Sequence, residues 1–515
     1  YGTMADAEEL IHEVHRRGMH IVFDMIFGHT SIEHPWFRES RRSRDNPRAD
    51  WYIWREGRRA RGATRNKGGR PPTNWKSITG VNGWQYEPLR DQWFYTNFLH
   101  FQPDLNFRNP QVKEAMFGAV RFWLDKGVDG FRLDIFHAIY KDDRFRDNPF
   151  SFRVGQPVDS NDGANQIKKY TMNLPENVEL ARELRELTDR WSPERVLIGE
   201  VFGEHQVIRR YLGSEEGPGE GPRAAPTPGL HAIFLFEMLR FSFRASFFRR
   251  ILTKFEALYP APLVPTLVLG NHDRPRWISR IGGDREAARR KARCIALLQL
   301  TARGIPVVYY GEEIGMEDGD FPFAGALDPV ARQFAWLPRW VARAFGLYLN
   351  RDGCRTPMQW EDGPGAGFSG GGAEVTPASP WLPVHPDYRV VNVATQRQDP
   401  ESLLNLYRDL LGLRARSAAL REGDFTLLEG DGVPRSVLCY RREAPSDGAP
   451  SDEALLVAIN FGRRTATFAP PALAPPALAP DARVLARTSP EARMEGDKLV
   501  LPPASGLILG RGIAS

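Results

Sequence analysis

Three acidic side chains stand at the ends of apolar segments, where a buried charge is expensive unless it is used or neutralised. They are Asp134 in GFRLDIF, Glu200 in IGEVFG and Asp273 in GNHDRPR. Carboxyl groups held in this way can act as a nucleophile and as a general acid or base. The sequence therefore predicts a site built from carboxylates at the ends of buried strands.

Arg132 stands two residues before Asp134, so on a strand the two side chains point to the same face. An adjacent guanidinium holds a carboxylate ionised at neutral pH, which a nucleophile requires. The alternative is a buried structural ion pair, and these two residues alone do not decide between the two interpretations. For Glu200 taken alone, a structural role is favoured.

The elements that must position these residues alternate between helix and strand. Thr3 and Asp6 form a capping box that begins one helix, and Asn109 with Pro110 begins another. Six apolar strand candidates cover 20–27, 128–135, 196–202, 230–236, 263–270 and 305–310. This alternation is typical of α/β proteins with parallel βα units, and a (β/α)8-type TIM barrel gathers strand ends around one site. Because six strands are two short of eight and the chain begins with Tyr1, we expect an N-terminally truncated barrel whose first two strands lie upstream.

Two regions interrupt the alternation. Residues 29–107 are rich in Trp, Arg, Gly and Pro, are too long for a simple loop and are predicted to form an inserted lid domain. Residues 420–515 contain short strand candidates separated by Pro, Gly and Asp, which predict a C-terminal β-sandwich. Residues 1–28 and 108–419 are assigned to the barrel. The low-complexity segments 213–229 and 470–480 are predicted loops.

The composition narrows the class of ligand. With 515 residues, 42% hydrophobic and 26% charged, the chain is neither a disordered nor a membrane-embedded protein. The net charge of +5 is spread along the chain, so we expect a neutral ligand and neither a nucleic-acid nor a membrane partner. Three cysteines without metal-ligand spacing predict no disulfide framework and no zinc site, and they favour a cytoplasmic location. The oligomeric state is not indicated.

Five motifs occur in a characteristic order: DMIFGHTS, QPDLN, GFRLDIF, GEVFGE and GNHDRPR. In order and spacing they resemble the conserved regions of the α-amylase superfamily of glycoside hydrolases, family 13. Three further segments, 33–57, 71–78 and NRDGCRTPMQW at 350–360, resemble the oligosaccharide-acting α-glucosidases, including the oligo-1,6-glucosidases. The resemblance extends to about residue 420.

The resemblance implies a role for each matching residue. Asp134 would be the nucleophile, Glu200 the general acid and then base, and Asp273 the carboxylate that binds sugar hydroxyls. The other implied contacts are His29 and His272 with the hydroxyls of the glucose, Asp24 with Arg132, and Arg351 with the non-reducing end, which would make the site a closed, exo-acting pocket.

A retaining glycosidase needs one ionised and one protonated carboxyl group. Asp134 beside Arg132 fits the first requirement. Glu200 lies among apolar neighbours and has no arginine in the four positions after it, so we expect it to hold its proton at a raised pKa.

The sequence also departs from the family pattern. Gly28 stands where calcium-dependent amylases have a calcium-binding Asn, which argues against a metal there. No cofactor is required for the chemistry, and a structural calcium site is expected only in the upstream segment. An aspartate and a stacking tyrosine of the glucose pocket would also lie upstream, which leaves the activity of this chain as it stands open. Ile135, after the nucleophile, favours α-1,6 over α-1,4 links because relatives with a large side chain there tend to accept them, a difference of only about 1–3 kcal/mol.

The sequence is therefore compatible with three functions. The first is a retaining exo-α-glucosidase that hydrolyses short α-glucosides with α-1,4 or α-1,6 links. The second keeps the covalent intermediate but passes glucose to a sugar hydroxyl, as in isomerases and transglucosidases of the trehalose synthase or sucrose isomerase type. The third is a catalytically inactive homologue with a binding role, against which the presence of all three carboxylates argues.

Overall fold

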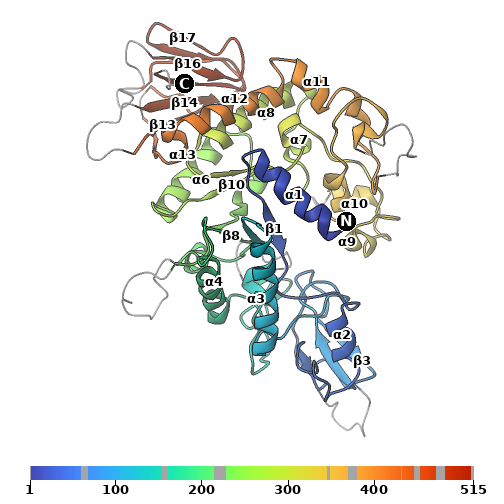
Figure 1. Ribbon diagram of the computed structural model, residues 1–515. Helices are drawn as coiled ribbons and strands as arrows, with labels where there is room; N and C mark the ends of the chain where they lie inside the picture. Colours follow the sequence, from blue (N-terminus) through green and yellow to red (C-terminus); the bar gives the residue numbers. More distant parts are fainter. Residues whose placement is uncertain are drawn as a thin grey trace. The chain divides into compact units, whose positions relative to one another are not determined.

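The chain divides into two compact units, Tyr1–Phe234 and Leu235–Ser515, which are described separately. Figure 1 presents the computed structural model of the protein. It describes residues 2–58, 68–153, 161–213, 228–344, 348–368, 380–430, 432–445, 453–470 and 482–511.

The first unit contains a parallel sheet with the order β1-β5-β8-β9. Its strands are β1 (Val22–Met25), β5 (Gly130–Leu133), β8 (Val196–Gly199) and β9 (Ala232–Ile233). The register places Asp24 beside Arg132, and Arg132 beside Ile198. Because all four strands run in the same direction, the residues that follow β5 and β8 emerge at the same edge of the sheet.

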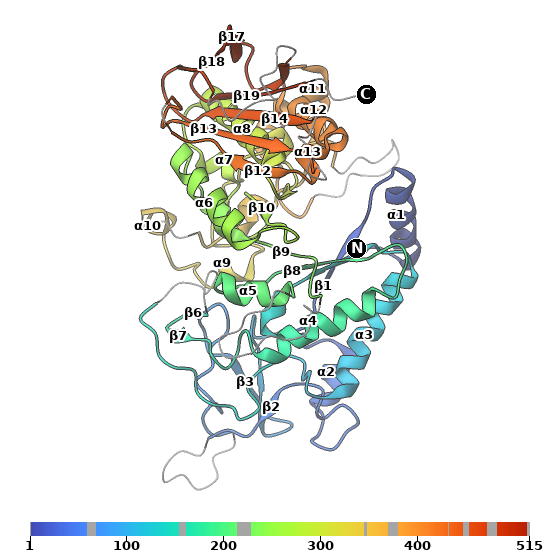
Figure 2. The same ribbon diagram turned by 90° about the vertical axis from the view of Figure 1, so that its left-hand side faces the viewer.

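Helices flank these strands along the chain. α1 (Met4–Arg16) precedes β1, the three helices α3 (Pro110–Asp125), α4 (Pro175–Thr188) and α5 (His205–Tyr211) lie between successive strands of the sheet, and the 3-10 helix η1 (Phe136–Ala138) follows β5. The capping box predicted at Thr3 and Asp6 is present, and Asn109 caps α3 by accepting from the backbone N–H of Gln111. α3 and α4 lie side by side, joined by an ion pair between Lys113 and Glu183 (Figure 2).

β5 and β8 approach closely because residue 130 is glycine. A Cβ atom at Gly130 would lie 2.0 Å from the backbone oxygen of Val196, a contact that no side chain tolerates. The motif that carries the predicted nucleophile thus needs its glycine for strand pairing.

The predicted lid region, residues 29–107, contains a small antiparallel sheet of order β2-β4-β3. Its elements are α2 (Pro35–Ser40), β2 (Trp54–Arg55), β3 (Trp84–Glu87) and β4 (Gln92–Tyr95). Trp75, Trp84 and Tyr95 are almost fully buried in its aromatic core, so these two tryptophans serve packing. A short hairpin of β6 (Asp162–Gly163) and β7 (Gln166–Ile167) follows later in the unit.

The second unit contains a parallel pair of strands, β10 (Thr266–Val268) and β11 (Ile305–Val307). α8 (Arg285–Thr301) connects them, and its last turns are buried from Cys294 to Thr301. The other helices of this unit are α6 (Ala245–Leu258), α7 (Trp277–Arg280), α9 (Pro329–Arg332), α10 (Arg339–Ala344), α11 (Val393–Gln398), α12 (Leu403–Arg416) and α13 (Ala418–Arg421). Its 3-10 helices are η2 (Phe236–Arg240), η3 (Glu312–Ile314), η4 (Arg351–Arg355), η5 (Pro364–Gly367) and η6 (Pro386–Arg389).

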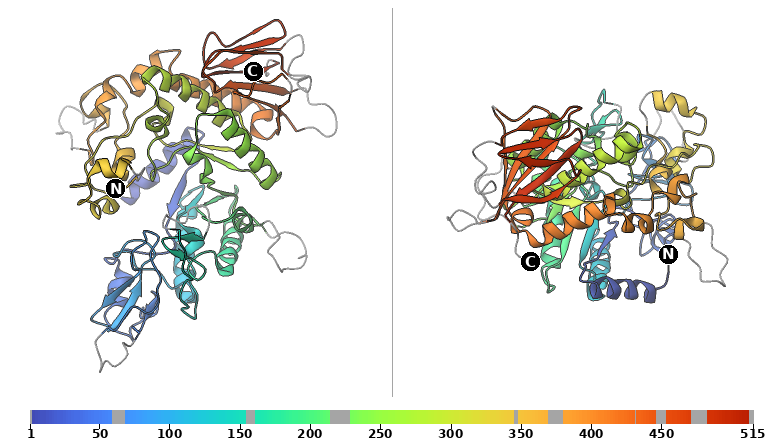
Figure 3. Two further views of the ribbon diagram at one scale, coloured as in Figure 1. Left: turned by 180° about the vertical axis from the view of Figure 1, so that it is seen from behind. Right: turned by 90° about the horizontal axis from the view of Figure 1, so that it is seen from above.

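Two antiparallel sheets occupy the C-terminal region, where a β-sandwich was predicted (Figure 3). One has the order β12-β13-β14-β19-β16 and the other β15-β18-β17. Their strands are β12 (Asp424–Leu427), β13 (Val437–Glu443), β14 (Ala454–Asn460), β15 (Ala466–Phe468), β16 (Arg483–Arg487), β17 (Arg493–Glu495), β18 (Lys498–Leu501) and β19 (Ser505–Gly510). Leu456 and Leu507 of the first sheet and Phe468 and Leu499 of the second share one hydrophobic core, as in a sandwich.

Each of the six predicted strand segments contains a strand, with shorter bounds than expected. The number of strands in a complete barrel and the proposed upstream strands stay predictions, as do the predicted domain boundaries. The observed division after Phe234 falls inside the predicted barrel region. The predicted loop segments lie mostly outside the described residues, at 214–227 and 471–481. Among the described helices, none is both long and apolar enough to span a membrane.

Candidate active site

In the first unit, the guanidinium of Arg132 contacts three carboxylates. Nη1 donates to Asp134 Oδ1 at 2.6 Å and to Asp24 Oδ1 at 2.8 Å, and Nη2 contacts Glu200. The side chains of Arg132, Asp134 and Glu200 are only 17%, 19% and 7% exposed, whereas Asp24 is 58% exposed. Asp134 and Glu200 therefore lie within the reach of a single guanidinium at the ends of adjacent strands.

The backbone fixes the two segments that carry these carboxylates. The N–H of Glu200 donates to the carbonyl of Leu133 at 2.9 Å, and the N–H of Phe136 donates to the carbonyl of Glu200 at 3.0 Å. Between them, Ile135 has φ 41° and ψ 44°, a left-handed conformation that is costly for a β-branched residue. This strained turn directly follows the predicted nucleophile and allows the chain to return to Glu200.

The electrostatics of this cluster differ from the prediction in one respect. Burial lowers the pKa of Arg132, but attraction by Glu200 and Asp134 outweighs it and raises the pKa above its ordinary value. Arg132 is therefore always charged. The apolar residues that flank Glu200 in the sequence are not its only neighbours, because the β5–β8 register brings Arg132 against it from the adjacent strand.

His29 follows β1, and backbone contacts with the QPDLN motif hold it there. His29 forms an isolated antiparallel bridge with Asp104, and the carbonyl of Gly28 accepts from the N–H of Leu105 at 2.9 Å. The His29 Nε2 atom lies 3.0 Å from the side-chain nitrogen of Gln102. Burial lowers the pKa of His29, whereas the negative charges of Asp104 and Asp134 raise it. Burial has the larger effect, so the ring is neutral at pH 7.

Sequence reasoning did not identify His137, which links the segments that carry Asp134 and Glu200. Its Nδ1 accepts from the N–H of Phe202 at 3.3 Å, and its carbonyl accepts from the N–H of Asn173 at 2.7 Å. The Asn173 side chain in turn donates to the carbonyl of Phe202 at 2.8 Å. Burial lowers the pKa of His137 to about 3, so it stays neutral and can accept this bond over the physiological range. Its position three residues after Asp134 was the only sequence signal.

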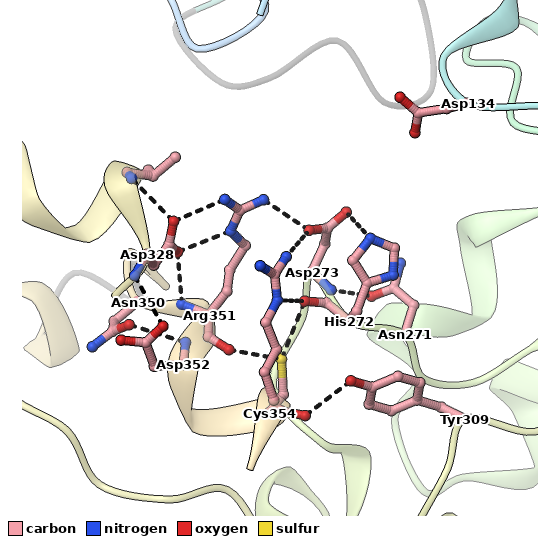
Figure 4. A network of polar contacts seen from close by, with 12 residues as sticks. Asp134, Asn271, His272, Asp273, Tyr309, Asp328, Asn350, Arg351, Asp352 and Cys354 are labelled. Carbon is pink, nitrogen blue, oxygen red and sulfur yellow. Dashed lines mark hydrogen bonds and ion pairs between the residues drawn. The ribbon is translucent and has the colours of Figure 1, made fainter. Parts of the chain in front are cut away.

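In the second unit, Asp273 Oδ1 accepts from two arginines. Arg351 Nη1 lies 2.9 Å away and Arg355 Nη2 lies 3.0 Å away, while His272 Nε2 lies 3.4 Å from Asp273 Oδ2 (Figure 4). Burial raises the pKa of Asp273, but His272, Arg351 and Arg355 together lower it below its ordinary value. Asp273 is therefore ionised, and both arginines bond to its Oδ1 atom and not to Oδ2.

Arg355 and Asp328 are further residues that sequence reasoning missed. Arg355 Nε also donates to the carbonyl of His272 at 2.8 Å, so it holds both the side chain of Asp273 and the backbone before it. Asp328 pairs with Arg351 at 2.8 Å. Arg355 could have been identified from the sequence, because it lies in the same motif as Arg351. Asp328 lies 23 residues before Arg351, and no motif in the sequence connects the two.

A second buried carboxyl group, Glu312 in η3, packs against the start of the GNHD motif. A Cβ atom at Gly270 would lie 2.0 Å from Glu312 Oε1, so this glycine leaves room for the acid. Glu312 Oε2 accepts from the N–H of Tyr309 at 3.2 Å. Burial raises the pKa of Glu312 to about 8, although the Tyr309 N–H and Arg276 lower it. The folded protein therefore holds this proton at neutral pH.

This proton makes stability depend on pH. The unfolded chain releases it near the ordinary value of 4.5 and the folded protein only near 8, so its stabilising contribution is complete below 4.5 and lost as the pH rises through 8. Glu312→Gln resembles the neutral acid, so we expect the variant to gain stability relative to the wild type between about pH 5 and pH 9. Thermal unfolding at several pH values measures this. Glu286→Gln, at an exposed carboxylate of α8, is the control, and a difference in Tm that does not change with pH for Glu312→Gln would contradict the prediction.

The described residues contain one group with the spacing of metal ligands, Asp189, Glu194 and His231. Arg185 already pairs with Asp189 at 2.6 Å and with Glu194 at 2.8 Å, so the group is an ion-pair cluster around a cation. The cysteines Cys294, Cys354 and Cys439 are free and buried. The absence of a cofactor stays a prediction.

The predicted site residues thus fall into two groups. Asp24, His29, Arg132, Asp134, Ile135 and Glu200 lie in the first unit, and His272, Asp273 and Arg351 lie in the second. Within each group the residues contact one another or follow adjacent strands. The convergence of all three carboxylates on one pocket stays a prediction.

The chain is similar to known proteins along most of its length. A family model described as the α-amylase catalytic domain matches residues 1–423. A probable α-glucosidase of Rhizobium meliloti is 35% identical over 437 residues, which cover 84% of this chain and 73% of that protein. An oligo-1,6-glucosidase of Parageobacillus thermoglucosidasius is 31% identical over 502 residues, covering 92% of this chain and 80% of that protein. The solved structure of a trehalulose synthase from Pseudomonas mesoacidophila is 28% identical, with a TM-score of 0.79 over 99% of this chain and 86% of that chain.

Proposed function

From the premise that this chain belongs to the α-amylase family of glycoside hydrolases, we propose that it is a retaining, exo-acting α-glucosidase of short α-glucosides. The family fold is a TIM barrel followed by a C-terminal sheet domain. The substrates proposed are neutral disaccharides and short oligosaccharides with α-1,4 or α-1,6 links. The names of the two glucosidases similar to this chain support this substrate class.

The observation that carries the proposal is the Arg132 cluster. One always-charged guanidinium contacts both Asp134 and Glu200 at the ends of adjacent parallel strands. Asp134 is held beside a cation, as a nucleophile must be, and Glu200 is the more deeply buried of the two carboxyl groups. A retaining glycosidase uses two such groups, one on each side of the bond that is cut.

The reaction proposed has two steps. Asp134 attacks the anomeric carbon while Glu200 donates a proton to the leaving oxygen, which gives a glucosyl ester of Asp134 and a free sugar. Glu200 then takes a proton from water, which attacks the same carbon and releases glucose and the Asp134 carboxylate. Two inversions at the anomeric carbon retain its α configuration.

The remaining residues are proposed to bind the glucose. Asp273 Oδ2 and His272 Nε2, 3.4 Å apart, would share a sugar hydroxyl, and the neutral His29 ring would bind another. Arg351 would close the pocket at the non-reducing end, and Ile135 would favour α-1,6 links. Asp24 would orient Arg132, with which it makes bonds of 2.8 and 3.0 Å.

A transfer reaction is the second candidate, because a trehalulose synthase is similar to nearly the whole chain. Both reactions pass through the same glucosyl ester, and they differ in whether water or a sugar hydroxyl attacks it. The fate of the disaccharide therefore separates the two functions, whereas the carboxylates do not.

Product analysis tests the proposal. Incubation of the protein with maltose, isomaltose and sucrose is expected to release glucose, and proton NMR at early times is expected to show α-glucose before mutarotation. Early β-glucose would exclude the retaining mechanism. A new disaccharide formed without free glucose would establish the isomerase instead, and no turnover of any of the three would overturn the proposed activity.

A further inference from the structure

Asp328 forms a bidentate ion pair with the guanidinium of Arg351. Arg351 Nε donates to Asp328 Oδ2 at 2.8 Å and Nη2 donates to Oδ1 at 2.8 Å, a parallel two-bond arrangement of high geometric specificity. The backbone N–H of Arg351 donates to the same Oδ2 at 3.0 Å. The Asp328 side chain is fully buried, and that of Arg351 is 18% exposed.

A second carboxylate fixes Asp328 in return. Asp352 Oδ1 accepts from the N–H of Asp328 at 3.0 Å, and Oδ2 accepts from the N–H of Leu327 at 2.7 Å. Asp328 Oδ1 also accepts from the N–H of Val330 at the start of α9. Each of the two segments, 327–330 and 350–355, is thus bound through a carboxylate of the other (Figure 4).

This arrangement determines which end of the guanidinium faces Asp273. With Nε and Nη2 held by Asp328, Nη1 is the nitrogen that lies 2.9 Å from Asp273 Oδ1. Arg351 therefore makes one bond to Asp273, although a free guanidinium would favour a two-bond pair with a carboxylate. Asp273 Oδ2 remains beside His272 as a result.

We propose that Asp328 is a positioning residue that restrains Arg351, so that Arg351 bonds only one oxygen of Asp273 and leaves the other, Oδ2, to bind the terminal glucose of the substrate together with His272. This rests on the proposed function, since the ligand is the glucose of an α-glucoside. Burial raises the pKa of Asp328, but its bonds to Arg351 lower it below the ordinary value, so the restraint is an ion pair at neutral pH.

Loss of the restraint changes the partner of Arg351. Among the described residues, Arg351 also contacts the carboxylate of Asp273, which would become its partner once the Asp328 carboxylate is removed. We expect the guanidinium to turn and pair with both Asp273 oxygens, which removes the sites proposed for sugar hydroxyls. The defect should therefore appear in glucose binding.

The test compares Asp328→Asn with the wild type on maltose and isomaltose. We expect KM and the inhibition constant of glucose to rise together by at least about 10-fold, with a smaller fall in kcat, as for loss of ground-state binding. In an Arg351→Ala background, Asp328→Asn is expected to change KM by less than about twofold, because a residue that acts through Arg351 has no further effect once it is gone.

Asp387→Asn is the matched control. Asp387 is a buried carboxylate of the same unit that pairs with Arg285 at 3.0 Å, so its loss tests the cost of breaking such a pair elsewhere. We expect this variant to lose stability without a change in KM. If Asp328→Asn fails to fold, Arg351→Lys replaces it, because a lysine keeps the charge but cannot form the parallel bonds and should raise KM in the same way.

The outcomes separate the two proposals. A wild type that releases no glucose overturns the proposed function and this inference with it. A wild type that is active, together with an unchanged KM for Asp328→Asn or Arg351→Lys, overturns the inference alone. Fully additive effects of Asp328→Asn and Arg351→Ala would also overturn it, since they would show a purely structural role.

Discussion

Asp134→Ala is expected to lower kcat on maltose and isomaltose by at least about 10³-fold, the largest effect of any single side chain in the first unit. Alanine removes the carboxylate that is proposed to form the covalent bond, and water cannot replace it from the same position. The fold should survive, because Arg132 keeps Asp24 and Glu200 as partners.

Azide tests the assignment directly. A small anion can enter the space left by the Asp134 carboxylate and attack the anomeric carbon, so we expect azide to restore turnover of an aryl α-glucoside and to give the β-glucosyl azide. Asp125→Asn is the matched control, since Asp125 is an exposed carboxylate at the end of α3 that bonds to Trp191. Retention of more than about one per cent of activity by Asp134→Ala would assign the nucleophile elsewhere.

Arg132→Leu is expected to damage both stability and activity. It leaves Asp134 and Glu200, which are 19% and 7% exposed, without the cation that both contact. Removal of one partner from a buried ion pair typically costs about 3–5 kcal/mol, so we expect a clear loss in the free energy of unfolding. Urea denaturation measures it.

The kinetic signature of Arg132→Leu should follow from the same cause. A carboxyl group without an adjacent cation holds its proton more tightly, so the residual activity should require a higher pH than that of the wild type. Arg132→Lys, which keeps the charge, should lie between the two. Arg121→Leu, which breaks an exposed pair with Glu114 on α3, is the control and should change stability by less than about 1 kcal/mol. A stable Arg132→Leu variant with a normal pH profile would contradict the role given to the cluster.

The features that the sequence predicted most accurately are local ones. Arg132 and Asp134 were expected on one face of a strand because side chains alternate with a period of two, and the structure brings them within 2.6 Å. The capping of α1 and α3 and the six strand segments also followed from short-range patterns. Such features depend on neighbours a few residues apart, which the sequence displays directly.

The contacts across strands and loops were decided by the tertiary structure alone. Arg132 reaches Glu200 because the register of β5 and β8 places it beside Ile198, and no pattern within either motif encodes that register. Asp328 binds Arg351 from 23 residues away, through a fully buried side chain that looks like any other acid in the sequence. Residue types and short spacings thus determined which groups are available for chemistry, whereas strand pairing and burial determined which of them touch, because a contact depends on packing between segments and not on their separation along the chain.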